Sequence, residues 1–179
     1  MTSLVITLVG PDRPGLVSAV SDKATEHGAN WADSLMANFA GQFAGIVQLD
    51  VPTERRDALM AALRALESSD LRIVVALAAD AGTAVATRRL QLDLVGHDRP
   101  GIIQTISGQL ASQGVSIDKM KTYIASGAMS GEQMFHLSAQ LSVPLTLEPD
   151  ALRTGLEGLA NELMVDISFD SPSADHTGT

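Results

Sequence analysis

The sequence predicts an α+β fold in which two βαββαβ units follow each other along the chain. Three observations lead to this prediction. A short polar motif occurs twice, the same order of strand-like and helix-like patterns accompanies each copy, and a stretch of small residues separates the copies. Repeats are considered first because each one corresponds to a structural unit. We expect each unit to be a ferredoxin-like antiparallel sheet with its helices on one face.

The repeated motif is Gly-x-Asp-Arg-Pro-Gly, which occupies residues 10–15 and returns at 96–101, a spacing of 86. Further along the chain, Phe43 corresponds to Phe135 at a spacing of 92. The rise from 86 to 92 means that six residues are inserted in the second copy. We place them at 126–131, a Gly- and Ser-containing segment that is predicted to be a longer hairpin tip.

The first unit begins with an apolar run at 4–9, which predicts an interior strand. We expect this strand to end before Gly10, because Pro11 and Pro14 lack backbone N–H donors. Pro14 suits the first turn of a helix. The other predicted elements of the unit are a helix at 16–27 ended by Gly28, strands at 30–39 and 43–51 joined by a turn at Gly41, a helix at 58–66 and a strand at 71–77.

The second unit repeats this order. Its predicted elements are a strand at 90–94, a helix at 102–113 ended by Gly114, strands at 115–125 and 133–143, a helix at 152–163 and a strand at 164–169. The resulting organisation is a first domain at 1–80, a linker at 81–88, a second domain at 89–170 and a flexible tail at 171–179.

Composition excludes several functional classes. The formal net charge of −9 argues against direct nucleic-acid binding, which requires a basic surface. The chain has no cysteine, so disulfides and thiolate chemistry are excluded. No run approaches the roughly 18 apolar residues of a membrane span, and no signal-peptide pattern is visible. We therefore expect a cytoplasmic protein that does not bind membranes.

The two motif loops are the candidate sites. Each joins a strand to a helix N-terminus, where free backbone N–H groups favour a carboxylate or another anion. Asp12 or Asp98 could pair with an ammonium group, so the loop has the chemistry of an α-amino acid site. Asn30 and Ser116 open the second strand of each unit, and we expect them beside the loop as hydrogen-bonding residues.

A purely structural interpretation is equally open from the motif alone. Asp12 and Asp98 would then cap their helices, and each Pro-Gly pair would only mark a helix start. The four histidines have no metal-ligand spacing, and no serine has legible histidine and carboxylate partners. We predict no catalytic residues, no metal and no cofactor.

The motif pair resembles the ACT domains over residues 3–169, and a chain made of two such domains resembles the glycine cleavage system transcriptional repressor group in its layout. The resemblance implies a non-enzymatic homodimer. It would sense an amino acid, glycine first, and would act on a transcriptional activator by protein contact. The ligand-binding positions that it implies are Gly10, Asp12, Arg13, Pro14, Gly15, Leu16 and Asn30, and in the second unit Gly96, Asp98, Arg99, Pro100, Gly101, Ile102 and Ser116.

The second copy departs from the first at two of these places. His97 replaces Pro11, and Ser116 replaces Asn30, which removes a side-chain amide. The two sites are therefore expected to differ in affinity or occupancy. Two other functions stay open: a structural interaction module without a ligand, and a regulatory subunit or fragment of an amino-acid biosynthetic enzyme.

Overall fold

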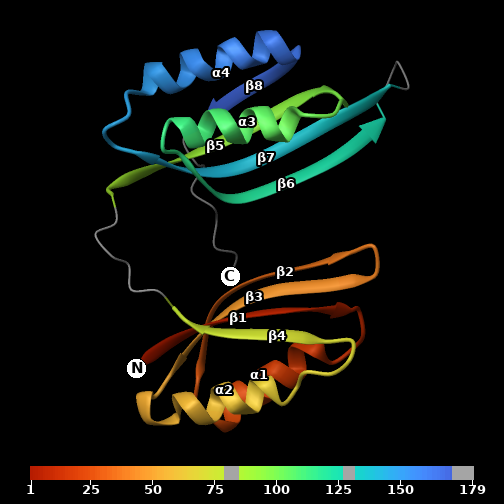
Figure 1. Cartoon of the computed structure of the whole chain (residues 1–179), viewed down its shortest axis with the longest axis vertical. Coiled ribbons are helices and arrows are strands. Elements are labelled where there is room, and N and C mark those ends of the chain that lie inside the picture. The colour runs from red at the N-terminus through yellow and green to blue at the C-terminus, as the bar shows by residue number, and fades with distance from the viewer. Residues whose placement is uncertain (79–84, 127–131, 171–179) are drawn as a thin grey trace. The chain divides into compact units, whose positions relative to one another are not determined.

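The computed structural model describes residues 1–78, 85–126 and 132–170 of the chain (Figure 1). It divides into two compact units, residues 1–82 and 83–179. Residues 127–131 of the hairpin tip predicted at 126–131, and the predicted tail at 171–179, lie outside the described residues.

The first unit contains four strands and two α-helices among its described residues. In chain order they are β1 (Thr2–Pro11), α1 (Leu16–Glu26), β2 (Asn30–Phe39), β3 (Gln42–Val51), α2 (Arg56–Arg64) and β4 (Arg72–Leu77), with a 3-10 turn at Thr53–Arg55 before α2. The second unit repeats the order with β5 (Thr87–His97), α3 (Ile102–Ser112), β6 (Ser116–Ser126), β7 (Gln133–Pro144), α4 (Pro149–Leu163) and β8 (Val165–Asp170). The predicted linker at 81–88 therefore extends too far, because its last two residues belong to β5 and pair with β7.

Each sheet has four strands, in the orders β2-β3-β1-β4 and β6-β7-β5-β8, and all neighbours are antiparallel. Both helices of a unit cover one face of its sheet (Figure 1). The predicted pair of ferredoxin-like units is confirmed, and β1 is an interior strand as its two-sided apolar pattern indicates.

Strand β1 is longer than predicted, because it continues through Gly10 to Pro11. Pairing between β1 and β4 ends at Val9, whereas pairing between β1 and β3 continues to Pro11 and Gln42. The next N–H, that of Asp12, is donated to Gly41 on the β3 side. Because N–H direction alternates along a strand, the missing N–H of Pro11 falls on the side where β4 has already ended, and no ladder bond is lost.

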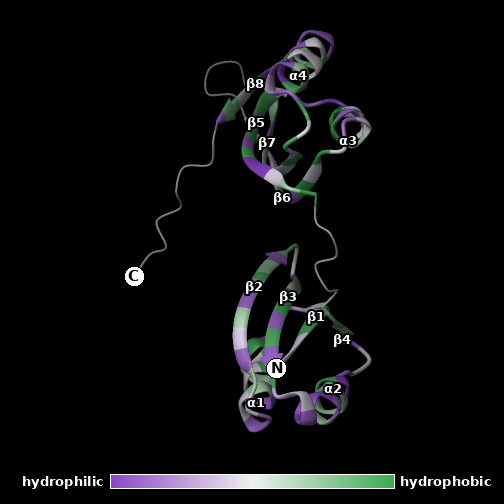
Figure 2. Ribbon diagram, turned by 90° about the vertical axis from the view of Figure 1, so that its left-hand side faces the viewer, coloured by the Kyte–Doolittle hydropathy of each residue, from purple (hydrophilic) through white to green (hydrophobic). Residues whose placement is uncertain are grey.

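Each unit has its own aliphatic core between sheet and helices. In the first unit Leu4, Ile6 and Leu8 of β1 pack against the helix stripe that includes Val20 and Leu63. No polar or charged side chain is buried in the described part of the chain. Figure 2 shows how apolar and polar residues alternate along the strands and segregate on the helices.

The helix-free faces of the two sheets differ in polarity. One cross-strand row of the first sheet contains Leu35, Ile46, Thr7 and Val74, and the equivalent row of the second sheet contains Lys121, Ser138, Asp93 and Ser168. Leu35, Ile46 and Val74 are all at least half exposed. The two units therefore share a fold, but the helix-free faces of their sheets differ in polarity.

Candidate ligand site at the β1–α1 loop

Asp12 attaches the β1–α1 loop to the tip of the β2–β3 hairpin. Its backbone N–H is donated to Gly41 O at 2.9 Å, and its carboxylate accepts a hydrogen bond from Asn38 Nδ2 at 2.5 Å. The hairpin turns through Ala40 and Gly41, both at positive φ, as a tight two-residue turn requires. The Asp12 carboxylate is therefore already engaged by a side chain of the sheet.

Helix α1 has a backbone start rather than a side-chain cap. Its N-cap is Gly15 at φ 92, and no side chain caps the helix. The corresponding residue of α3 is Gly101 at φ 96, again without a side-chain cap. The interpretation of Asp12 and Asp98 as helix caps is therefore wrong. The glycine of each Pro-Gly pair is needed because a positive φ favours glycine.

Gly10 allows the loop that precedes β4 to pack closely against β1. A Cβ at this position would lie 2.6 Å from the carbonyl oxygen of Asp70, closer than a real side chain tolerates, and 3.2 Å from Leu71 Cα, which is a tight contact. The glycine therefore brings Asp70 next to the β1–α1 loop, although the two segments are far apart in sequence.

Between these two loops lies a small pocket of about 60 Å³, lined by Pro11, Arg13, Leu16, Asp70 and Leu71. Arg13 and Asp70 are exposed. Within the described part of the chain, the side chains of both lack an ion-pair or hydrogen-bond partner. A guanidinium binds a carboxylate in bidentate geometry, and a carboxylate binds an ammonium group. Opposite charges on an apolar base suit a small zwitterion.

The second unit repeats the backbone of this loop. Asp98 N–H is donated to Gln133 O at 3.0 Å, as that of Asp12 is to Gly41. A Cβ on Gly96 would lie 2.3 Å from Val165 Cγ1, so this glycine also permits a close approach, here to the start of β8. Both copies of the motif therefore have the same main-chain role.

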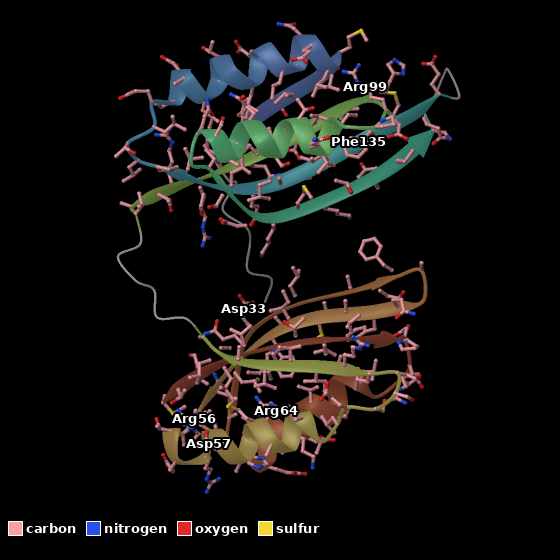
Figure 3. The ribbon with its side chains drawn as sticks, viewed as in Figure 1. Asp33, Arg56, Asp57, Arg64, Arg99 and Phe135 are labelled. Atoms are coloured by element: carbon pink, nitrogen blue, oxygen red, sulfur yellow. The ribbon has the colours of Figure 1, made fainter. Side chains whose placement is uncertain are left out.

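The side chains around the second loop differ. Arg99 is engaged, because its Nη2 donates to Glu162 O at 3.2 Å near the C-terminal end of α4 (Figure 3). The strand registers place Met164 where the first unit has Asp70, and Ile124 where it has Asn38. The second loop therefore lacks both the free guanidinium and the carboxylate of the first.

Asn30 and Ser116 do not lie beside the loops of their own units, so that expectation is wrong. Asn30 pairs with Asp50, and Ser116 pairs with Ser142, at the end of each sheet where β1 and β5 begin. The loop lies at the level of Gln42, eight residues further along β3 and thus roughly 26 Å away at 3.3 Å per residue. Helix α1 returns along the whole sheet, so β2 begins at the far end.

The remaining predicted positions lie together at each loop, namely Gly10, Asp12, Arg13, Pro14, Gly15 and Leu16 in the first unit and Gly96, Asp98, Arg99, Pro100, Gly101 and Ile102 in the second. Sequence reasoning missed Asp70 and Asn38. The predicted topology contained the necessary signal: in a βαββαβ unit, the end of the second strand and the start of the fourth lie beside the end of the first.

The groups with shifted pKa values lie away from the pocket, on exposed helix surfaces. On α1, the hydrogen bond from Lys23 lowers the pKa of Glu26. On α2, the 2.8 Å hydrogen bond between Arg56 and Asp57 lowers the pKa of Asp57 and raises that of Arg56 (Figure 3). The described residues contain no cluster of three potential metal ligands, and none of their helices is both long and apolar enough to span a membrane.

A comparison with protein-family models identifies the family of this chain. The ACT domain model matches residues 2–76 and again residues 88–170. The chain belongs to the ACT-domain family. It consists of two ACT domains in tandem, and the candidate loop site described above lies in the first of them.

Two solved structures resemble nearly the whole chain. An unknown protein from Galdieria sulphuraria has 26% identity and a TM-score of 0.78, and the match covers 96% of this chain and 99% of that chain. A candidate glycine cleavage system transcriptional repressor has 20% identity and a TM-score of 0.67, covering 94% and 96%. The second likeness shows a shared fold.

A curated relative matches a shorter region. The UPF0237 protein of Methanopyrus kandleri is 37% identical over 51 residues, which are 28% of this chain. The match spans 57% of the length of that relative.

Proposed function

We propose that this protein is a non-enzymatic, cytoplasmic sensor of a small α-amino acid, with glycine as the first candidate, and that it regulates a transcriptional activator by protein contact. The observation that carries the proposal is the pocket of the first ACT domain, in which Arg13 and Asp70 provide opposite, unpaired charges around an apolar base.

The ligand carboxylate would bind the Arg13 guanidinium and the free N–H groups at the start of α1. The ammonium group would bind the Asp70 carboxylate. The volume of about 60 Å³ leaves little room for a side chain, which favours glycine or alanine. Because the pocket joins two loops from different parts of the chain, a bound ligand would hold them together. Ligand binding would then change the affinity of the protein for its protein partner, so the two binding equilibria are coupled.

A second function is favoured by a specific observation. Gly10, the Asp12 N–H and Gly15 each have a main-chain role that requires no ligand. The motif is thus also compatible with a docking module that binds a protein partner and senses nothing. A regulatory subunit of an amino-acid biosynthetic enzyme would likewise act by binding a protein partner.

The partner and the assembly are also part of the proposal. The net charge of −9 favours contact with a protein over contact with nucleic acid. The likeness to a candidate glycine cleavage system transcriptional repressor supports the proposed role in transcriptional regulation. We propose a homodimer, which light scattering after gel filtration would test: a monomer mass would contradict it.

The test is titration calorimetry of the full chain with glycine, alanine and leucine, with acetate and methylamine as half-ligands. We expect glycine to bind and both half-ligands to bind at least about tenfold more weakly, because each loses one charged contact. Glycine at 100 times its dissociation constant should add about 2.7 kcal/mol to the free energy of unfolding.

Matched variants locate the site. Arg13→Gln and Asp70→Asn should each weaken glycine binding at least about tenfold. Arg99→Gln and Asp166→Asn change the same residue types in the second domain and should leave binding unchanged. No heat or stabilisation with any amino acid would overturn the sensor and favour the docking module.

A further inference from the structure

The second ACT domain contains a cavity that is separate from its loop. It measures about 310 Å³ and lies between the start of β5, the first turns of α4 and the end of β8. Its walls include Arg88, Leu90, Asp150, Leu152, Arg153 and Phe169. Gln91 pairs with Asp170 here, so the cavity is at the end of the sheet opposite the Gly96 loop. We call it the α4 cavity; its volume is within the range of about 300–1,000 Å³ that is typical of small-molecule sites.

The equivalent strand position of the first domain is more deeply buried. Leu4, which corresponds to Leu90, is fully buried, whereas Leu90 is half-buried. In the first domain the 3-10 turn Thr53–Arg55 leads into α2, whereas in the second domain residues 145–148 join β7 to α4 without a 3-10 turn. This connection accepts a hydrogen bond from Arg88, whose Nη2 lies 2.9 Å from Leu147 O. Arg88 is thereby held at the cavity wall.

The walls combine balanced charges with an apolar base. Arg88 and Arg153 are cationic, Asp150 and Asp170 are anionic, and Leu90, Leu152 and Phe169 supply apolar surface. Helix α4 also begins at the cavity with Glu148 as an N-cap that makes no side-chain capping bond. Its dipole adds to the attraction of the arginines for an anionic group. A ligand that satisfies all these groups carries one negative charge, one positive charge and an apolar body.

From this arrangement we infer that the α4 cavity is a second ligand site, which binds an α-amino acid with a large apolar side chain. The carboxylate is bound by Arg88 and Arg153, the ammonium group by Asp150 or Asp170, and the side chain lies on Leu90 and Phe169. The site shares no residue with the Arg13–Asp70 pocket, so the inference does not depend on the proposed function.

Phenylalanine titrated into the full chain tests the inference, with 3-phenylpropionate, phenethylamine and glycine as analogues that each lack one feature. We expect phenylalanine to bind the α4 cavity with a dissociation constant on the order of 1 mM or tighter, and each analogue to bind this cavity at least about tenfold more weakly, as followed by the amide signals of its lining residues. Amide chemical shifts in a ¹⁵N spectrum should change around Arg88, Leu152 and Phe169 and stay constant around Arg13.

The neighbouring arginines of β5 provide a matched control. Arg88→Met should weaken phenylalanine binding at least about tenfold, whereas Arg89→Met, which changes a residue outside the cavity lining, should not. Arg153→Met tests the site without touching the Arg88–Leu147 bond, should Arg88→Met fail to fold. The inference would be overturned if phenylalanine did not bind or if the analogues bound the cavity equally well. It would also be overturned if Arg88→Met and Arg89→Met had equal effects, or if the shifts were confined to the Arg13 loop. Glycine binding at Arg13 would be unaffected by any of these results.

Discussion

At the residue scale, Gly10 and Gly96 determine how closely the strand before each loop approaches its neighbour. Their built Cβ atoms would lie 2.6 Å from Asp70 O and 2.3 Å from Val165 Cγ1. The consequences for the site differ, because the neighbouring backbone belongs to Asp70 in the first domain, whereas the neighbour in the second domain is the aliphatic Val165. An identical motif residue thus supports a charged pocket in one domain only.

Gly96→Ala should destabilise the second domain by about 1–3 kcal/mol, because the added methyl overlaps Val165 and the backbone must shift. Chemical denaturation measures the change. Gly108→Ala is the control: a Cβ there meets nothing within 4 Å inside helix α3, so stability should not fall. A neutral Gly96→Ala variant would mean that β8 moves away without cost.

The charges at Arg13 and Arg99 illustrate how the environment of a residue decides what it can do. Both arginines occupy the same motif position, but Arg99 donates to Glu162 O at a helix C-terminus, where a cation is favourable. Arg13 has no such partner in the described part of the chain, and it lines the pocket. The proposed ligand site at the loop therefore belongs to the first domain only.

At the scale of the element, helices α1 and α3 begin in the same way, with a glycine at positive φ directly before the first helical residue. The first four N–H groups of such a helix are free of intrahelical bonds. Space is open around Gly15 and Gly101, since a Cβ at either would meet nothing within 4 Å. Backbone conformation, not crowding, therefore requires these glycines.

The same substitution should have opposite effects at two glycines of the second domain. Gly101→Ala is expected to cost about 1–2 kcal/mol, because φ 96 is strained for a residue with a Cβ. Gly158→Ala, in the interior of α4 with open space around it, should add about 0.5–1 kcal/mol through helix propensity. Thermal and urea unfolding of both variants checks the signs, and destabilisation by Gly158→Ala would contradict the account.

At the scale of the whole molecule, the chain has two separate aliphatic cores. Each contains a fully buried leucine of its second helix, Leu63 in the first domain and Leu156 in the second. Trp31 is the only tryptophan and packs partly against the first core. Its fluorescence therefore reports on the first domain.

Leu63→Ala should lower the free energy of unfolding seen by Trp31 fluorescence by about 2–5 kcal/mol, the usual cost of truncating a buried leucine. Leu156→Ala removes the same group from the second core. It should leave the Trp31 transition in place while accelerating amide hydrogen exchange in β5 and β7. Equal displacement of the Trp31 transition by both variants would show that the two domains unfold as one cooperative unit.

Much of the architecture follows from the sequence alone. The duplicated motif established the two-domain repeat, alternating residues such as Leu90, Leu92 and Leu94 predicted a strand, and helical stripes with a terminal glycine predicted α1 and α3. These patterns are local, and backbone periodicity is a local property. The position of each motif loop at the start of a helix could be predicted from the sequence for the same reason.

The tertiary structure decided what surrounds each loop. It placed Asp70 beside Arg13, moved Asn30 and Ser116 to the far end of their sheets, and connected Arg99 to the end of α4. The α4 cavity likewise depends on residues of β5, α4 and β8 that are distant in sequence. The physical reason is that a binding site is formed by side chains brought together through strand order and register, and these depend on how the whole chain packs.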